Sequence, residues 1–174
     1  MDGTLAVLFL LTGLIDMTVN HCDRGCMKAA WTGIRHTVSA GQLVFEADVI
    51  GQEAYYRLDA PVSFGPFRPA VGISVDTHGD VWIGAGAVNE FSTVDGRGYA
   101  ELSFMPGRWI RSETGPVLGY PLEFRSGLEA GIYQEDGDRV GVSLDHRSNG
   151  GLGHPTPNPG LETVLMRYGR THGE

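Results

Sequence analysis

The stretch LEFRSGLEAGI, residues 122–132, decides the fold class because two kinds of side chain alternate along it. The apolar set comprises Leu122, Phe124, Leu128, Ala130 and Ile132. The alternate positions are charged or small: Glu123, Arg125, Gly127, Glu129 and Gly131. Successive side chains of a β-strand point to opposite faces, so a two-residue period predicts a strand with one apolar and one polar face.

The same alternation recurs along the chain from residue 42 onward, where helical periods are absent. We predict eight strands, within residues 42–49, 54–59, 71–75, 81–87, 100–104, 122–132, 140–148 and 162–168. Turn sequences such as THGD at 77–80 and EDGD at 135–138 separate them. Short alternating strands in meander order predict an all-β fold, an eight-stranded antiparallel up-and-down β-barrel.

Alternation alone leaves open which face points inward, because a soluble barrel turns its apolar face to the core and a membrane barrel turns it to lipid. The polar face carries paired charges and several glycines, which suit a narrow eight-stranded lumen. Lys28 is the sole lysine, whereas soluble domains normally place several on their surface and on edge strands. We therefore predict a transmembrane barrel in the outer membrane of a Gram-negative bacterium.

The N-terminal segment, residues 1–30, is predicted to be a secretory signal or its remnant, and residues 31–174 a single barrel domain. Residues 4–15, TLAVLFLLTGLI, form an apolar run that is short for a transmembrane helix. Cys22 and Cys26 lack a second pair to complete a zinc site, so a local disulfide and two free thiols both remain open. The net charge of −8 and the lack of a basic run exclude a nucleic-acid partner.

The loop HRSNGGLGHPTPNPGLE, residues 146–162, brings together a base, a hydroxyl and a carboxylate. His146 and Ser148 continue the apolar face of the seventh predicted strand. Glu162 begins the eighth strand, which returns antiparallel, so its side chain is expected at the same rim. Nucleophilic ester hydrolysis needs this set: serine attacks, histidine takes its proton and the acid orients the imidazole.

This motif resembles the signature of the outer-membrane lipid A 3-O-deacylase (PagL type) family, in which H-x-S-N precedes a loop ending N-x-G-x-E. The resemblance implies an esterase that removes the 3-O-linked acyl chain of lipid A, with lipopolysaccharide as substrate and no cofactor. It implies that Ser148 is the nucleophile, His146 the base and Glu162 the orienting acid. It further implies that Asn158, with the backbone N–H groups of Asn149 and Gly150, forms the oxyanion hole.

Two alternatives to a serine esterase remain at this stage. His146, His154, Asp145 and Glu162 could bind zinc, although Asp145 is expected on the opposite face and no zinc-protease spacing occurs. The chain could also be a non-catalytic eight-stranded barrel that anchors or carries an apolar ligand. A homodimer is left open.

Overall fold

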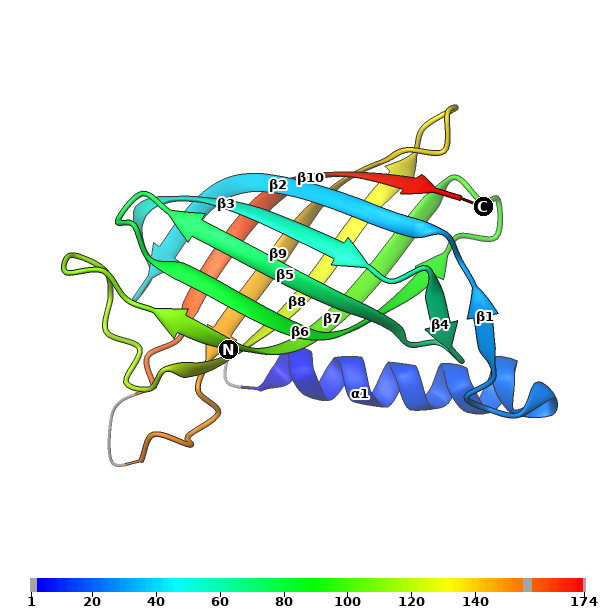
Figure 1. Ribbon diagram of the computed structural model, residues 1–174, viewed down its shortest axis with the longest axis horizontal. Coiled ribbons are helices and arrows are strands. Elements are labelled where there is room, and N and C mark those ends of the chain that lie inside the picture. The colour runs from blue at the N-terminus through cyan, green and yellow to red at the C-terminus, as the bar shows by residue number, and fades with distance from the viewer. Residues whose placement is uncertain (1–2, 155–157, 174) are drawn as a thin grey trace.

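The computed structural model describes residues 3–154 and 158–173 and shows a closed antiparallel barrel (Figure 1). Strand order around the barrel is β10-β2-β3-β5-β6-β7-β8-β9, and antiparallel pairing of β10 with β2 closes it. The strands are β2 (Ile34–Phe45), β3 (Asp48–Asp59), β5 (Arg68–Asp76), β6 (Val81–Ser92), β7 (Gly98–Ile110), β8 (Leu122–Tyr133), β9 (Arg139–Ser148) and β10 (Leu161–His172). Two short strands outside the barrel, β1 (Ala29–Trp31) and β4 (Val62–Phe64), pair with each other.

The predicted eight-stranded barrel is confirmed, but the prediction of one strand over residues 42–49 is wrong. Residues 42–45 end β2, residues 48–49 begin β3, and Glu46 and Ala47 form the turn between them. Both turn residues have positive φ, 51° and 73°, a conformation in which glycine or asparagine is usual. The barrel therefore starts at Ile34, eight residues before the predicted start at residue 42.

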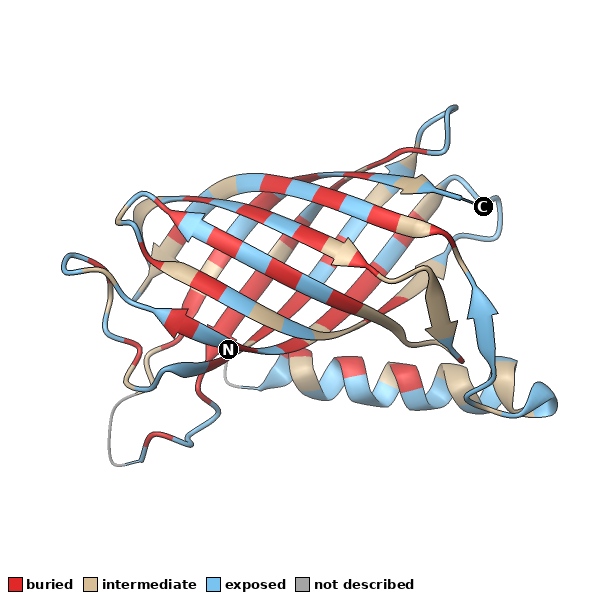
Figure 2. Cartoon of the chain, viewed as in Figure 1, coloured by how far each residue is buried: buried red, intermediate tan, exposed pale blue. Residues whose placement is uncertain are grey.

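The two faces of the sheet are chemically opposite, and the apolar face points outward. Figure 2 shows buried and exposed residues alternating along the strands. On β8, Leu128 and Ile132 are exposed outside, whereas Glu123, Arg125 and Glu129 are buried in the lumen. This orientation is that of a membrane barrel, in which the outer surface contacts lipid.

Buried ion pairs occupy the lumen. Arg125 lies 2.7 Å from Glu53, Arg167 lies 2.7 Å from Asp145, and all four side chains are buried. Pairing of this kind is what allows charges to be buried at all. Toward one end an apolar layer completes the packing, formed by Leu43, Tyr55, Trp82, Met105, Trp109, Leu118, Leu161 and Leu165.

The two ends of the barrel differ in their connections. At the loop end lie residues 46–47, 77–80 and 111–121 and, from the β9–β10 connection, residues 149–154 and 158–160. The two longest connections between barrel strands, β7–β8 and β9–β10, are therefore both at this end. The opposite end, here called the terminal end, holds the start of β2, the end of β10 and the remaining connections between strands (Figure 1). Outer-membrane barrels place their long loops outside. The two longest connections here follow that rule, whereas the connections at 46–47 and 77–80, at the same end, are short.

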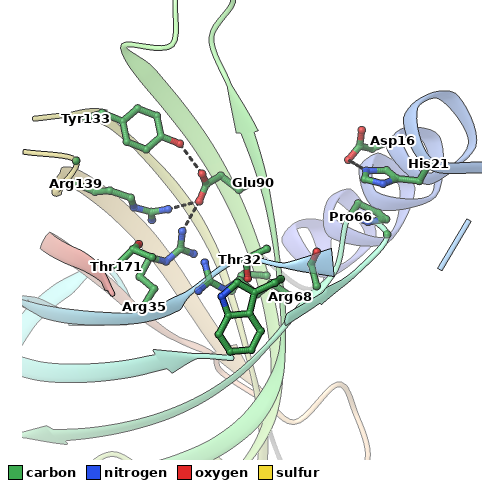
Figure 3. A pocket seen from close by; sticks show the side chains of 15 residues that line it. Asp16, His21, Thr32, Arg35, Pro66, Arg68, Glu90, Tyr133, Arg139 and Thr171 are labelled. Atoms are coloured by element: carbon green, nitrogen blue, oxygen red, sulfur yellow. Dashed lines mark hydrogen bonds and ion pairs between the residues drawn. The ribbon is translucent and has the colours of Figure 1, made fainter. Parts of the chain in front are cut away.

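Side chains from several strands line a recess at the terminal end, as Figure 3 shows. Glu90 accepts hydrogen bonds there from Arg35, Arg139 and Tyr133. Asp16 and His21 approach from the N-terminal segment, on the other side of the recess. The charge of Glu90 is therefore paired with arginines at this end of the lumen as well.

The N-terminal segment forms helix α1 (Thr4–Asp16), which lies along the outside of the barrel against β7 and β8 (Figure 1). Leu5, Phe9 and Gly13, spaced four residues apart, form its buried side. The helical stretch Thr4–Arg24 is long and apolar enough to cross a membrane. Cys22, near the end of this stretch, forms a disulfide with Cys26, one of the two alternatives that the sequence leaves open.

Candidate active site

His146 and Ser148 lie on the outward face of β9, near the loop end of the barrel. Each is paired with a residue of β8, His146 with Ser126 and Ser148 with Phe124. Their outward neighbour Val142 is exposed, whereas His146 and Ser148 are 2% and 7% exposed. The two side chains therefore lie on the apolar face, as predicted. Neighbouring groups shield them from solvent.

Glu162 lies directly opposite His146 across the β9–β10 ladder. Its Oε1 is 3.0 Å from His146 Nδ1, within hydrogen-bond distance. The second ring nitrogen, Nε2, is buried and has no hydrogen-bond partner among the described residues. A carboxylate at Nδ1 favours the tautomer that carries its proton there, which leaves Nε2 as an acceptor.

A cavity of about 520 Å³ opens beside these side chains. Its polar side chains are those of Ser126, His146, Ser148 and Asn158, and Gly150 and Gly151 of the β9–β10 connection form part of the wall. The apolar wall includes Phe104 and Phe124, whose rings stack with centroids 5.6 Å apart, and Gly3 and Ala6 of the N-terminal segment. Its shape and chemistry suit an ester on an apolar chain.

Asn149 makes hydrogen bonds to three residues near this cavity. Its backbone N–H donates to Asn158 Oδ1 at 3.0 Å, and its side-chain amide donates to the Leu118 carbonyl at 2.9 Å. Its Oδ1 accepts from the Gly151 N–H at 2.8 Å. The Asn149 N–H, one of the predicted oxyanion donors, is therefore engaged with Asn158, and the side chain ties the β7–β8 loop to the β9–β10 connection.

Gly160 is a site residue for which the sequence analysis predicts no role, although it is the glycine of the N-x-G-x-E pattern. Its φ is +77°, and a Cβ at this position would lie 2.8 Å from His146 Cε1. Any side chain here would press on the imidazole and strain the backbone. Asn158, Gly160 and Glu162 thus follow one another at two-residue intervals. Asn158 brings an amide to the cavity, Gly160 lets the backbone pass close to His146, and Glu162 brings the carboxylate to Nδ1.

The arrangement contradicts the zinc alternative. Asp145 points into the lumen, where Arg125 and Arg167 donate to it, and it cannot share a ligand set with His146. His154 is exposed in the β9–β10 connection. Within residues 3–154 and 158–173, no group of three or more His, Cys, Asp or Glu side chains is placed to hold a metal ion.

A barrel with a lipid-facing exterior, a charge-filled lumen and a base beside a hydroxyl on its outer wall is typical of outer-membrane enzymes that act on lipid esters. Comparison with known families identifies which one. The model of the lipid A 3-O-deacylase (PagL) family matches residues 54–171, and the chain belongs to this family.

Comparison with solved structures supports the fold. The crystal structure of the outer membrane enzyme PagL superposes with a TM-score of 0.64 at 20% identity, covering 79% of this chain and 99% of that one. A de novo designed transmembrane β-barrel superposes with a TM-score of 0.57 at 9% identity, covering 84% and 99%. Comparison with curated proteins gave no significant match.

Family membership makes the chain a lipid A deacylase, a carboxylic ester hydrolase of the Gram-negative outer membrane. The enzyme class is thereby confirmed over a non-catalytic carrier barrel. Because the loop end faces outside in such barrels, the candidate site lies at the level of the outer leaflet. The roles of individual site residues stay predictions.

Proposed function

We propose that the chain hydrolyses the 3-O-linked acyl ester of lipid A with Ser148 as nucleophile, His146 as general base and Glu162 as orienting acid. The observation that carries this proposal is that His146 lines the same cavity as Ser148, with its Nδ1 bonded to Glu162 and its buried Nε2 without a hydrogen-bond partner among the described residues. A histidine bonded at Nδ1 to an acid and open at Nε2 is the arrangement that activates a serine hydroxyl.

In the first half of the reaction, Ser148 Oγ attacks the ester carbonyl carbon and its proton passes to His146 Nε2. The tetrahedral intermediate then expels the sugar oxygen, which takes the proton back from Nε2. This leaves the acyl chain esterified to Ser148. No hydrogen bond joins Ser148 and His146 among the described contacts, so the hydroxyl must rotate toward Nε2, as catalytic groups commonly do when substrate binds.

In the second half, water attacks the acyl-serine and gives its proton to His146. Collapse of the second intermediate returns that proton to Ser148 Oγ and releases the fatty acid. Glu162 stabilises the imidazolium in both halves through its contact with Nδ1. The released chain can move directly into the membrane, because the cavity opens on the outer face of the barrel.

The negative oxygen of each intermediate needs hydrogen-bond donors. Asn158 Oδ1 accepts from the Asn149 N–H, which leaves the two protons of its Nδ2 available as donors. Gly150 follows Ser148 by two residues and lines the cavity. We assign Asn158 Nδ2 and the Gly150 N–H to the oxyanion hole and Asn149 to the positioning of Asn158.

Mass analysis of lipid A incubated with purified variants tests this function. The parent should remove one 3-linked chain, and Ser148→Ala and His146→Ala should each leave lipid A intact. Ser92→Ala, which removes a hydroxyl from the terminal end, is the matched control and should retain activity. Each variant must first show the gel-mobility shift on boiling that marks a folded barrel. A folded Ser148→Ala barrel that deacylates at the parent rate would exclude the serine mechanism.

A further inference from the structure

Arg108 occupies an unusual position for a charged residue. It lies on the outward face of β7, exposed, two residues from the loop end of that strand. Its neighbours across the sheet are Ile83 on β6 and Leu122 on β8, both exposed and apolar. A cation on the lipid-facing side is costly at the bilayer centre and tolerated near the headgroups, so its depth is that of the interface.

Within the described part of the chain, Arg108 also differs from most arginines because its side chain makes no hydrogen bond or ion pair. Six arginines are buried in the lumen, and each is paired with a carboxylate: Arg35, Arg57, Arg125, Arg139, Arg147 and Arg167. At the loop end, Arg111 donates to the Gly115 carbonyl at 2.7 Å. Among the contacts of the described residues, none is a hydrogen bond or ion pair of the Arg108 side chain.

Strand register places Arg108 within reach of the candidate active site. Ser148 pairs with Phe124, and Phe124 pairs with Pro106, two residues before Arg108 on the same outward face. Two strand spacings and two residues along the strand put the Cα atoms of Arg108 and Ser148 roughly 12 Å apart. Because the strands are tilted, this register places the Cα atoms of Arg108 and Ser148 at a similar depth, and the long Arg108 side chain can extend its guanidinium toward the loop end.

Lipid A is a phosphorylated glucosamine disaccharide whose acyl chains enter the membrane. When the 3-linked ester lies at Ser148, the sugar and its phosphates lie farther from the bilayer centre, at a depth that the extended Arg108 side chain can reach. Guanidinium groups bind phosphate through paired charge-assisted hydrogen bonds, and such bonds are stronger where water is partly excluded. An unpaired arginine at this place and depth has the chemistry to hold a phosphate.

We propose that Arg108 binds a phosphate of lipid A and sets the enzyme's preference for phosphorylated substrate. This inference rests on the proposed function, because it places the substrate ester at Ser148. Arg108 would act on binding of the headgroup and not on the bond-breaking steps, so its effect should appear in KM and leave kcat nearly unchanged.

Kinetics in detergent micelles with two purified substrates, bisphosphorylated lipid A and the same lipid A stripped of phosphate, test the proposal. Arg108→Gln should raise KM for bisphosphorylated lipid A about tenfold, the loss expected for one charge-assisted hydrogen bond. On the dephosphorylated substrate its KM should equal that of the parent. Arg108→Lys should restore most of the phosphate preference, since lysine also binds phosphate. Arg108→Leu, which matches the apolar neighbours, should behave like Arg108→Gln.

Arg97→Gln is the matched control, because Arg97 is an exposed arginine in the turn at the opposite end. It should leave both KM values unchanged. A folded Arg108→Gln enzyme with parent KM on both substrates, or with the same rise on both, would overturn the proposal. Failure of the serine mechanism would appear separately, as residual activity of Ser148→Ala, and would not alter the phosphate dependence of KM.

Discussion

His146 and Glu162 face each other directly across the β9–β10 ladder, with Nδ1 and Oε1 3.0 Å apart. The pair is thus built on two barrel strands, and the β9–β10 connection does not have to hold it. Closure of β10 onto β2 fixes the register of β10, and with it the position of the carboxylate. A rigid sheet holds functional side chains more accurately than a long loop does.

Glu162→Gln should retain folding and some activity, because it removes the charge that stabilises the imidazolium but keeps the nucleophile and the base. We expect its loss of kcat to be smaller by roughly one to two orders of magnitude than that of Ser148→Ala, by analogy with measured triads. Single-turnover deacylation of lipid A measures both. Glu113→Gln changes an exposed carboxylate at the same end and should have no effect. Undiminished activity of folded Glu162→Gln would require a different orienting group.

Gly160→Ala should reduce kcat while leaving the barrel folded. The new methyl group would lie 2.8 Å from His146 Cε1, at a φ of +77° that alanine adopts poorly, so the imidazole must move. A displacement of about 1 Å in a catalytic group can cost two orders of magnitude in rate. Gly151→Ala also changes a glycine of positive φ, with open space around its Cβ, and serves as the control. Equal kcat values for the two variants would contradict a steric role of Gly160.

Asn149→Ala should lower both stability and kcat. In the parent the Asn149 side-chain amide donates to the Leu118 carbonyl, and the variant leaves this carbonyl without a donor. An unsatisfied buried group of this kind costs about 1–3 kcal/mol. Because the same residue holds Asn158 through its backbone N–H, loosening of the connection should also weaken the oxyanion hole. Thermal midpoints and initial rates measure the two effects. A variant with reduced stability but parent kcat would separate Asn149 from the positioning of Asn158.

The sequence predicted the barrel well because alternation reports directly on which face of a strand contacts lipid. Residues 122–132 lie in β8 with the predicted faces, and the shared face of His146 and Glu162 became a cross-strand pair. The first hairpin was missed since Glu46 and Ala47 form its turn without glycine, proline or asparagine, and alternation continues through them.

Contacts between distant segments could not be predicted in the same way. Engagement of the Asn149 N–H by Asn158 depends on the path of the β9–β10 connection, which periodicity does not describe. The unpaired state of Arg108 depends on the partners of every other charge nearby, so it appears only in three dimensions. The close approach of Gly160 to His146 likewise needs the fold, although the glycine itself is visible in the motif.

Acid should destabilise the terminal end of the barrel by protonating Asp138, which lies in the β8–β9 turn. Hydrogen bonds from Arg170 and then Tyr168 lower the pKa of Asp138 to about 2. A carboxyl in an unfolded chain has a pKa of about 3.9, so the folded barrel gains stability above that pH and loses it as pH falls toward 2. Asp138→Asn should therefore lower the midpoint of the heat-induced gel shift at pH 7, with a difference that vanishes near pH 2. Glu135→Gln, in the same turn, is the control, and a pH-independent difference would contradict this assignment.

Removal of residues 1–27 should increase the rate of lipid A deacylation. Gly3 and Ala6 line the cavity beside His146 and Ser148, and Phe9 packs against Phe104 with ring centroids 6.1 Å apart. The helix therefore occupies wall space that an acyl chain needs, whereas the barrel closes through β10 and β2 without it. The shortened chain should keep its gel shift and show a lower KM for lipid A. A matched variant, Phe9→Ala, should move in the same direction by a smaller amount. Unchanged kinetics in both variants would mean that the helix does not compete with substrate for the cavity.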